Sequence, residues 1–170
     1  WITGSSTGIG FATAEKFLNK NWKVVISSSN FEKLSLAKKK LLEKTSNTEL
    51  YTYECNISNR AIVKNTIDKI VKEIGSIDLA ILNAAAYSPN KEQKFSIENY
   101  EHLIDVNLKG TLYCLEFLIE KMRYSNNHIA IVSSPVGYRG LPTAGAYGLT
   151  KAGLINLSES LFFDLKKYKI

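Results

Sequence analysis

Tyr147 and Lys151 are the pair whose types and spacing point most directly to chemistry. They stand four positions apart in the segment "AGAYGLTK", so one helical turn places both side chains on the same face. A free tyrosine has a pKa of about 10, and a nearby ammonium group favours the phenolate. Ser134 follows an apolar run and supplies a hydroxyl that can orient a carbonyl oxygen. The pattern indicates acid–base chemistry on a carbonyl group, and its alternative is an ordinary surface pair on a helix.

Three glycines near the start of the chain form a second candidate site. Gly4, Gly8 and Gly10 lie in "WITGSSTGIG", directly after an apolar pair. At the end of a strand and the start of a helix, such glycines leave free N–H groups and the positive helix end where a pyrophosphate can bind. No Lys-Ser/Thr pair follows, so the segment is not a P-loop for phosphoryl transfer. The alternative is a tight structural turn.

The elements that must position these residues alternate between strand and helix. Apolar or β-branched runs predict strands at 22–28, 48–55, 78–82 and 128–134, and the letters "WIT" are typical of the end of another strand. Helical patterns cover roughly 8–20, 31–45, 59–74, 97–124 and 144–168. This order predicts an α/β fold, a doubly wound parallel sheet between two helical layers, in one domain over 1–170. Both ends look unfinished, so we expect an incomplete sequence that continues beyond residue 170.

Together these features resemble the short-chain dehydrogenase/reductase family over nearly the whole chain. "TGSSTGIG" is similar to the family's TGxxxGxG cofactor loop, and "YGLTK" is similar to its YxxxK motif. Ser134 stands thirteen residues before Tyr147, which is the usual separation in the family. Asn107 in "IDVNLKGT" matches its fourth catalytic residue. Four motifs in the correct order make the resemblance specific.

The resemblance implies a Rossmann-type domain and an NAD(P)-dependent oxidoreductase that interconverts an alcohol and a ketone or aldehyde by hydride transfer. Tyr147 would act as acid and base, and Lys151 would lower its pKa and hold the nicotinamide ribose. Ser134 would orient the carbonyl or alcohol, and Asn107 would hold a water of the proton relay. The implied cofactor-binding residues are Gly4, Ser6, Gly8, Ile9, Gly10, Ser28, Ser29, Asn30, Asn56, Ile57, Asn83, Ala84, Tyr147 and Lys151.

The chain departs from the family pattern at two positions near the cofactor. The family's NNAG segment reads Leu82-Asn83-Ala84-Ala85 here, so Ala85 adds a methyl group where backbone and cofactor pack closely. The usual aspartate after the third strand is Asn56, whose amide can still hydrogen-bond an adenine edge. Neither change touches the proton chemistry.

Cofactor choice depends on the end of the second strand. An acidic residue about 20 positions after the glycines normally binds the ribose hydroxyls of NAD and repels the 2′-phosphate of NADP. This chain has Ser28, Ser29 and Asn30 there, and Lys33 follows on the next helix. The arginine that NADP-preferring relatives often carry around Ser29 is missing as well. We therefore expect NADP to be preferred over NAD by a modest margin.

Other residues give little support for further chemistry or partners. Cys55 and Cys114 lie far apart, which indicates neither a disulfide framework nor a zinc site and favours a reducing cytoplasm. His102 and His128 have no ligand motif, so we expect both to be structural and no metal to bind. The net charge is +6, but the basic run 38–40 is typical of a solvated helix face rather than a nucleic-acid arm. No apolar run is long enough to span a membrane.

We expect a small carbonyl or alcohol substrate and a homodimer or homotetramer. Segments 86–96 and 135–145 are predicted to line part of the substrate pocket. Apolar residues on the two longest helices suit a contact between protomers as well as core burial, and they are Leu112, Leu115, Phe117, Leu118, Leu154, Leu157, Leu161 and Phe162.

Two other functions remain open. An epimerase or dehydratase of the family's extended branch normally carries TGxxGxxG, whereas three residues separate Gly4 from Gly8 here. A catalytically silent dinucleotide sensor or scaffold usually lacks the tyrosine or the lysine, and this chain has both.

Overall fold

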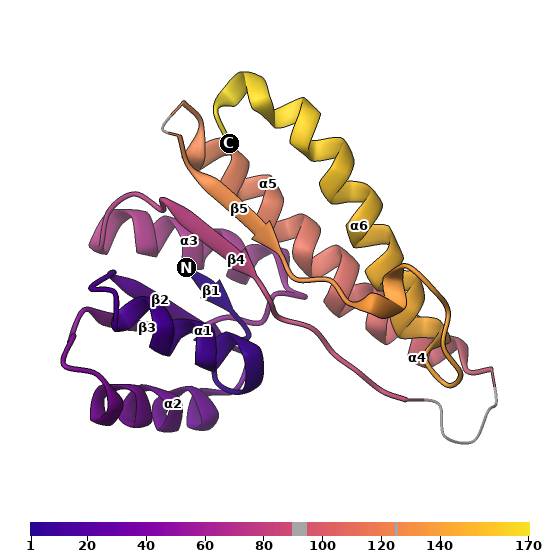
Figure 1. The fold of residues 1–170 in the computed structure, drawn as a ribbon, viewed down its shortest axis with the longest axis horizontal. Helices are drawn as coiled ribbons and strands as arrows, with labels where there is room; N and C mark the ends of the chain where they lie inside the picture. The colour runs from indigo at the N-terminus through magenta and orange to yellow at the C-terminus, as the bar shows by residue number, and fades with distance from the viewer. Residues whose placement is uncertain (90–94, 125) are drawn as a thin grey trace.

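A parallel sheet of five strands forms the centre of the fold (Figure 1), and the computed structural model describes residues 1–89, 95–124 and 126–170. The strands lie in the order β3-β2-β1-β4-β5. Their bounds are β1 Ile2–Thr3, β2 Val24–Ser28, β3 Leu50–Glu54, β4 Leu79–Leu82 and β5 His128–Ile131. Ile2 of β1 is in register with Ile26 on one side and Ile81 on the other. Successive strands are therefore added on one side of β1 as far as β3 and on its other side from β4 onward, and ligands bind at this switch point in sheets of this type.

Helices cover both faces of the sheet. One face carries α1 Gly8–Leu18 and α2 Phe31–Lys44, and the other carries α3 Arg60–Glu73, α5 Gly110–Met122 and α6 Gly145–Leu165 (Figure 1). A hydrophobic core lies on each face of the sheet, and successive residues of β2 point into one core or the other. Val24 and Ile26 pack against α1 and α2, while Val25 packs toward α3 and α5. This confirms the doubly wound α/β arrangement expected from the apolar runs.

The helix expected at 97–124 has a different geometry in its middle. It begins as α4, Ile97–Leu103, widens into a π-helix, η1, at Ile104–Lys109, and continues as α5. Asn107 lies in the widened segment, and its side chain is bonded to the backbone of Ala86 beside β4. Wide turns of this kind are common at functional sites, and no apolar pattern reveals them.

Two further elements end earlier than expected. The strand expected at 128–134 stops at Ile131, which pairs with Leu82 at the end of β4, and Pro135–Gly137 form a short 3₁₀ turn, η2. Val132 N still donates to Leu82 O at 3.0 Å, but β4 itself ends at Leu82, so the pairing does not continue to 134. The last helix ends at Leu165 and is followed by a 3₁₀ turn, η3, at Lys166–Tyr168.

Asparagine and serine side chains fix the starts of several helices. Asn30 Oδ1 accepts from the backbone N–H of Lys33 at 2.8 Å, and Asn59 and Ser96 cap α3 and α4 in the same way. The first helix is different, because Thr7 at its N-cap makes no side-chain hydrogen bond and its first turn holds no acidic residue. The backbone N–H groups that open α1 are therefore left for another acceptor.

Most apolar residues expected at a contact between protomers lie in the core instead. Leu115, Phe117, Leu118 and Leu154 are buried, and Leu157 and Leu161 pack against the same core. These residues form the part of the apolar surface that covers the sheet, because α5 and α6 each use more than one stripe against the sheet and each other. Exposed apolar side chains on the two helices are Leu112, Leu149, Phe162 and Phe163.

Candidate active site

A cavity of about 510 Å³ lies at the carboxyl ends of the strands. The loops after β1, β2, β3 and β4 line it, together with the side chains of His102 and Val106. All cofactor-binding residues expected from the ends of these strands lie on its walls, except Gly8 and Gly10. The topology therefore gathers residues from four separate segments around one space.

The glycine loop forms one wall of this cavity. Gly4 and Gly8 have φ values of +62° and +58°, a conformation that other residues rarely adopt. A Cβ atom at Gly4 would lie 2.6 Å from Ala84 Cα, and one at Gly10 would lie 2.6 Å from Asn83 Nδ2. Gly10 therefore lets the loop pack against the end of β4, while Gly4 lines the cavity itself. The loop leaves the N-terminal N–H groups of α1 beside the cavity, which is the arrangement that binds a pyrophosphate.

Hydrogen bonds hold this loop against the neighbouring strands. Ser5 is buried, and its backbone N–H donates to Ser27 O at 3.0 Å while its hydroxyl donates to Ile2 O at 2.7 Å. On the other side, Asn83 Nδ2 donates to Thr3 O at 3.0 Å and to Gly4 O at 3.1 Å. The loop is thus preorganised between β2 and β4.

The second wall follows β2 and β3. Ser28 Oγ accepts from Ser6 Oγ at 3.1 Å and from Asn30 N at 3.3 Å, which leaves its own proton available to a ligand. Ser29, Asn30 and Lys33 complete this wall, and Asn56 and Ile57 continue it after β3. None of the described residues that line the cavity is an aspartate or a glutamate.

Three of the four expected catalytic residues lie together just beyond this cavity. The Ser134 side chain lies close enough to Tyr147 to lower the pKa of its phenol, and Lys151 Nζ lies 5.5 Å from the centre of the Tyr147 ring. Ser134 is held at the end of β5 as the N-cap of η2, while the other two project from the first turns of α6. Ser133 Oγ donates to Lys151 O at 2.9 Å and fixes the helix against this strand end.

Burial, Ser134 and Tyr87 act on the phenol of Tyr147 in different directions. Burial raises its pKa, the Ser134 side chain lowers it, and Tyr87 raises it further. Lys151 Nζ lies 5.5 Å from the ring centre and donates to Val132 O at 2.8 Å, and the lowering of the pKa by Lys151 stays a prediction. Lys151 is only 2% exposed, and burial lowers the pKa of its ammonium group.

Asn107 is close to these residues but does not face them directly. It is 1% exposed, and its two amide hydrogens bond Ala86 O at 3.0 Å and Thr150 Oγ1 at 3.1 Å. Its Oδ1 accepts from Ala86 N at 2.7 Å. Both side-chain donors are thus used within the protein, and the expectation that Asn107 holds a water of the proton relay stays a prediction. What the side chain does is join the loop after β4 to α6.

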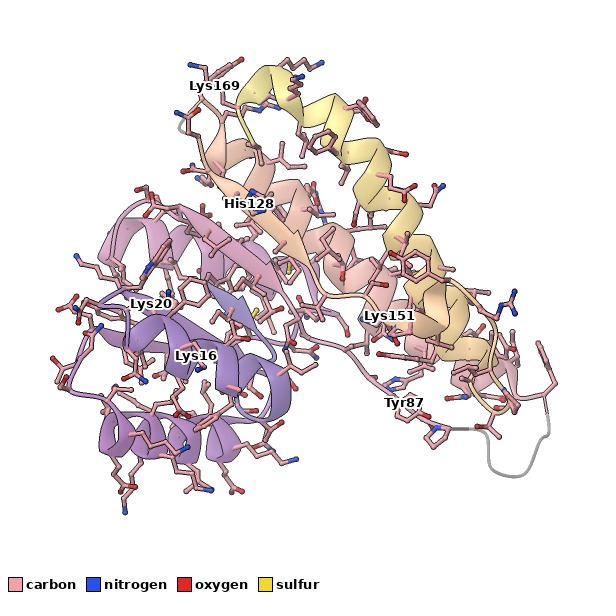
Figure 2. The ribbon with its side chains drawn as sticks, in the orientation of Figure 1. Lys16, Lys20, Tyr87, His128, Lys151 and Lys169 are labelled. Carbon is pink, nitrogen blue, oxygen red and sulfur yellow. The ribbon has the colours of Figure 1, made fainter. Side chains whose placement is uncertain are left out.

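Several residues on the site were not expected. Tyr87 is 60% exposed, and its ring meets Tyr147 edge to face at 4.9 Å between centroids and 69° between planes; it lies near Lys151 in Figure 2. His102 and Val106 line the cavity from α4 and η1, where the sequence favoured only a structural histidine. His102 and Val106 stand four positions apart, and this spacing was the signal that could have placed both on one face of a helix. Residues 90–94 of the segment expected to line the substrate pocket lie outside the described residues.

The described residues contain neither a helix suited to a membrane nor a cluster of metal-binding side chains. No helix there is long and apolar enough to cross a membrane. No group of three or more His, Cys, Asp or Glu side chains lies close enough together to hold a metal ion in the part of the chain that the structure describes.

The fold and the site are similar to those of known oxidoreductases. A 3-oxoacyl-(acyl-carrier-protein) reductase, FabG, of Rickettsia typhi is 34% identical over 167 residues, which cover 96% of this chain and 65% of the relative. The NAD+-bound structure of a xylitol dehydrogenase superposes with a TM-score of 0.90 at 28% identity, over 99% of this chain and 65% of that one. A levodione reductase structure gives a TM-score of 0.92 at 25% identity, over 98% and 66% of the two chains.

The chain spans about two thirds of the length of these proteins. The family described as short chain dehydrogenase matches it over residues 1–170. The chain therefore belongs to the short-chain dehydrogenase family.

Proposed function

We propose that this protein is an NAD(P)-dependent oxidoreductase that interconverts an alcohol and a ketone or aldehyde. The observation that carries the proposal is the gathering of Ser134, Tyr147 and Lys151, in which the Ser134 side chain lowers the pKa of the Tyr147 phenol and Lys151 Nζ lies 5.5 Å from the centre of its ring. These groups lie beside a cavity whose walls suit a dinucleotide. The names of the relatives, two reductases and a dehydrogenase, support the same class of reaction.

The residues that line the cavity fit a dinucleotide cofactor. Gly4 lines the cavity and lets the loop lie against Ala84, since a Cβ there would come within 2.6 Å of Ala84 Cα, and the open N-terminus of α1 offers N–H groups to a pyrophosphate. Asn56 and Ile57 would hold the adenine, and Ser28 and Asn83 would hydrogen-bond the sugar groups. When bound, the cofactor supplies or accepts the hydride.

The proton chemistry belongs to this chain's own side chains. Ser134 donates a hydrogen bond to the substrate oxygen and orients it toward Tyr147. In the reduction, the Tyr147 hydroxyl gives its proton to the oxygen that becomes the alcohol, and in the oxidation the phenolate removes it. Lys151 must leave Val132 O, or use its remaining hydrogens, to stabilise that phenolate. Asn107 is a positioning residue, since it holds Ala86 and Thr150 on the two sides of the site.

We further propose that the preferred cofactor is NADP. The described walls of the cavity carry Lys33 and lack any carboxylate that would repel a 2′-phosphate. The exposed Ser29 hydroxyl and the Asn30 amide can donate to a phosphate, although Asn30 Oδ1 is occupied by the cap of α2. None of the described lining residues is an arginine, whose guanidinium could bind the phosphate through two charged hydrogen bonds, so the preference is modest.

The test measures turnover of a panel of ketones, aldehydes and alcohols with both cofactors, together with cofactor binding. Tyr147→Phe keeps the ring and removes the hydroxyl, so turnover should fall about 100-fold or more while cofactor still binds. Lys151→Ala should weaken both turnover and binding. Tyr124→Phe, at an exposed tyrosine after α5 and away from the site, is the matched control and should keep both. Near-native turnover by Tyr147→Phe would falsify the mechanism, and cofactor binding without turnover on any substrate would favour the sensor or scaffold.

A further inference from the structure

His102 lines the proposed dinucleotide cavity, and none of the roles assigned so far accounts for this residue. Two side chains that can carry positive charge line this cavity, Lys33 on α2 and His102 in the last turn of α4. The imidazole is exposed, and none of the described lining residues brings a carboxylate to compete for it. A histidine in such a place is available to an anion that enters the cavity.

The structure fixes the position of this histidine. His102 and Val106 lie four residues apart, and both face the cavity next to Ala85 and Ala86. The two hydrogen bonds between Asn107 and Ala86, at 2.7 and 3.0 Å, tie the end of this helix to the cavity wall. Leu103, the next residue, is fully buried and anchors α4 from the other side. The helix therefore holds the imidazole at the cavity rather than leaving it on a mobile surface.

The charged and titratable groups around His102 leave it free to bind an anion. On its own helix, Glu98 accepts from Ser96 Oγ at 2.7 Å, Asp105 is paired with Lys109 at 2.7 Å, and Glu101 is exposed. Across the cavity are Lys33 and Cys55, and burial raises the pKa of that thiol and keeps it neutral. The helix α6 meets α4 where Gly145 approaches Tyr100. Two titratable groups of α6 lie on this side: Tyr147, whose pKa is raised by burial, and Lys151, which donates to Val132 O.

We propose that His102, in its protonated form, binds a phosphate group of the dinucleotide. This rests on the proposed function, because it requires a dinucleotide in the cavity. The group is either the pyrophosphate, which NAD and NADP share, or the 2′-phosphate of NADP alone. Imidazole gains its charge between pH 8 and pH 5, so the contact strengthens over that interval as the pH falls. A charge-assisted hydrogen bond at an exposed site corresponds to an affinity gain of about fivefold.

The experiment measures dissociation constants of NAD+ and NADP+ for the purified protein at about pH 6 and about pH 8, where imidazole changes charge. Three variants are compared with the wild type. His102→Gln removes the charge, and His102→Lys keeps a charge that does not titrate in this range. His128→Gln is the matched control, since His128 is the chain's other histidine and lies at the far end of β5 from Lys151 (Figure 2). Thermal unfolding of each variant verifies that it is folded.

From low to high pH, we expect the wild type and His128→Gln to lose about fivefold in affinity. His102→Gln should show no change of affinity with pH, and His102→Lys should bind tightly at both pH values. The effect with both cofactors assigns the contact to the pyrophosphate, and an effect with NADP+ alone assigns it to the 2′-phosphate. Equal dissociation constants for the wild type and His102→Gln at both pH values overturn this inference alone. A wild-type protein that binds neither cofactor overturns the proposed function and this inference with it.

Discussion

At the scale of single residues, Tyr147 shows how burial and hydrogen bonding compete at one phenol. Burial disfavours the charged phenolate and raises the pKa, while the Ser134 hydroxyl favours the phenolate and lowers it. The ring of Tyr87 contributes by covering Tyr147 and by its own phenol, which disfavours a second negative charge. Tyr87 thus influences a proton-transfer group without taking part in the transfer.

Replacement of Tyr87 by alanine should move the pH dependence of alcohol oxidation. The substitution exposes Tyr147 and removes the neighbouring phenol, so the pKa of Tyr147 falls and oxidation rises at a lower pH than in the wild type. The measurement is a pH profile of kcat for an alcohol found in the substrate panel. Tyr87→Phe keeps the cover and should shift the profile less. An alanine variant whose profile coincides with that of the wild type would contradict the prediction.

At the scale of elements, the π-helical segment η1 at Ile104–Lys109 links the two halves of the site. It turns Asn107 inward, where one side chain satisfies both backbone groups of Ala86 and donates to Thr150. Thr150 in turn donates to Tyr147 O at 2.8 Å. The loop after β4, the widened helix and α6 are therefore joined through a single buried amide.

Asn107→Ala should lower the free energy of unfolding by about 3 kcal/mol, because the N–H and C=O groups of Ala86 lose their partner in a buried place. Denaturant unfolding measures the difference. Asn65→Ala is the control, since Asn65 is exposed in the middle of α3 and its loss should cost less than about 0.5 kcal/mol. Equal effects of the two substitutions would show that the amide of Asn107 has no special structural role.

The end of β2 is the element that decides between the two cofactors. Ser29→Arg adds a charged partner and should tighten NADPH binding, while Ser28→Asp adds a like charge and should weaken it. Because Ser28 also bonds Ser6, Ser28→Asn is the control for the change in shape without the charge. Dissociation constants of NADPH and NADH test all three. Wild-type protein that binds NADH about tenfold more tightly, or 1.4 kcal/mol, would reject the NADP preference.

At the scale of the whole molecule, exposed apolar side chains on α5 and α6 favour a contact between protomers. Phe162 and Phe163 are 69% and 73% exposed, and Leu112 and Leu149 lie on the same two helices. Side chains of this size are rarely left in water when they lie on adjoining elements, since their burial against a second copy is favourable. They are the part of the apolar surface that the sheet does not use.

We therefore expect a dimer or tetramer in solution at micromolar concentration. Phe163→Glu places a charge in the contact and should reduce the mass measured by light scattering to that of the monomer. Phe31→Glu is the matched control, because Phe31 is 65% exposed but lies on α2, on the opposite face of the sheet. A monomeric wild-type protein would rule out this contact.

The sequence by itself determined the features that depend on local chemistry. The spacing of Gly4 and Gly8 required the positive φ values that the loop adopts, and the apolar runs placed the strands because a parallel sheet buries both faces of each strand. The interval between Tyr147 and Lys151 placed both on one face of α6 because a helix repeats every 3.6 residues. Motif spacing likewise led to Ser134, which lies within hydrogen-bond reach of Tyr147.

Only the tertiary structure decided which partners these residues meet. Lys151 donates to Val132 O, and the Asn107 amide donates to Ala86 O and Thr150 Oγ1. The same holds for His102, which reaches the cavity only because α4 packs beside the loop after β4. Each of these contacts joins segments that are far apart in the chain, so neither helical periodicity nor motif spacing contains it. The packing of helices on the sheet sets it, because a buried polar group must find its partner among whatever groups that packing brings close.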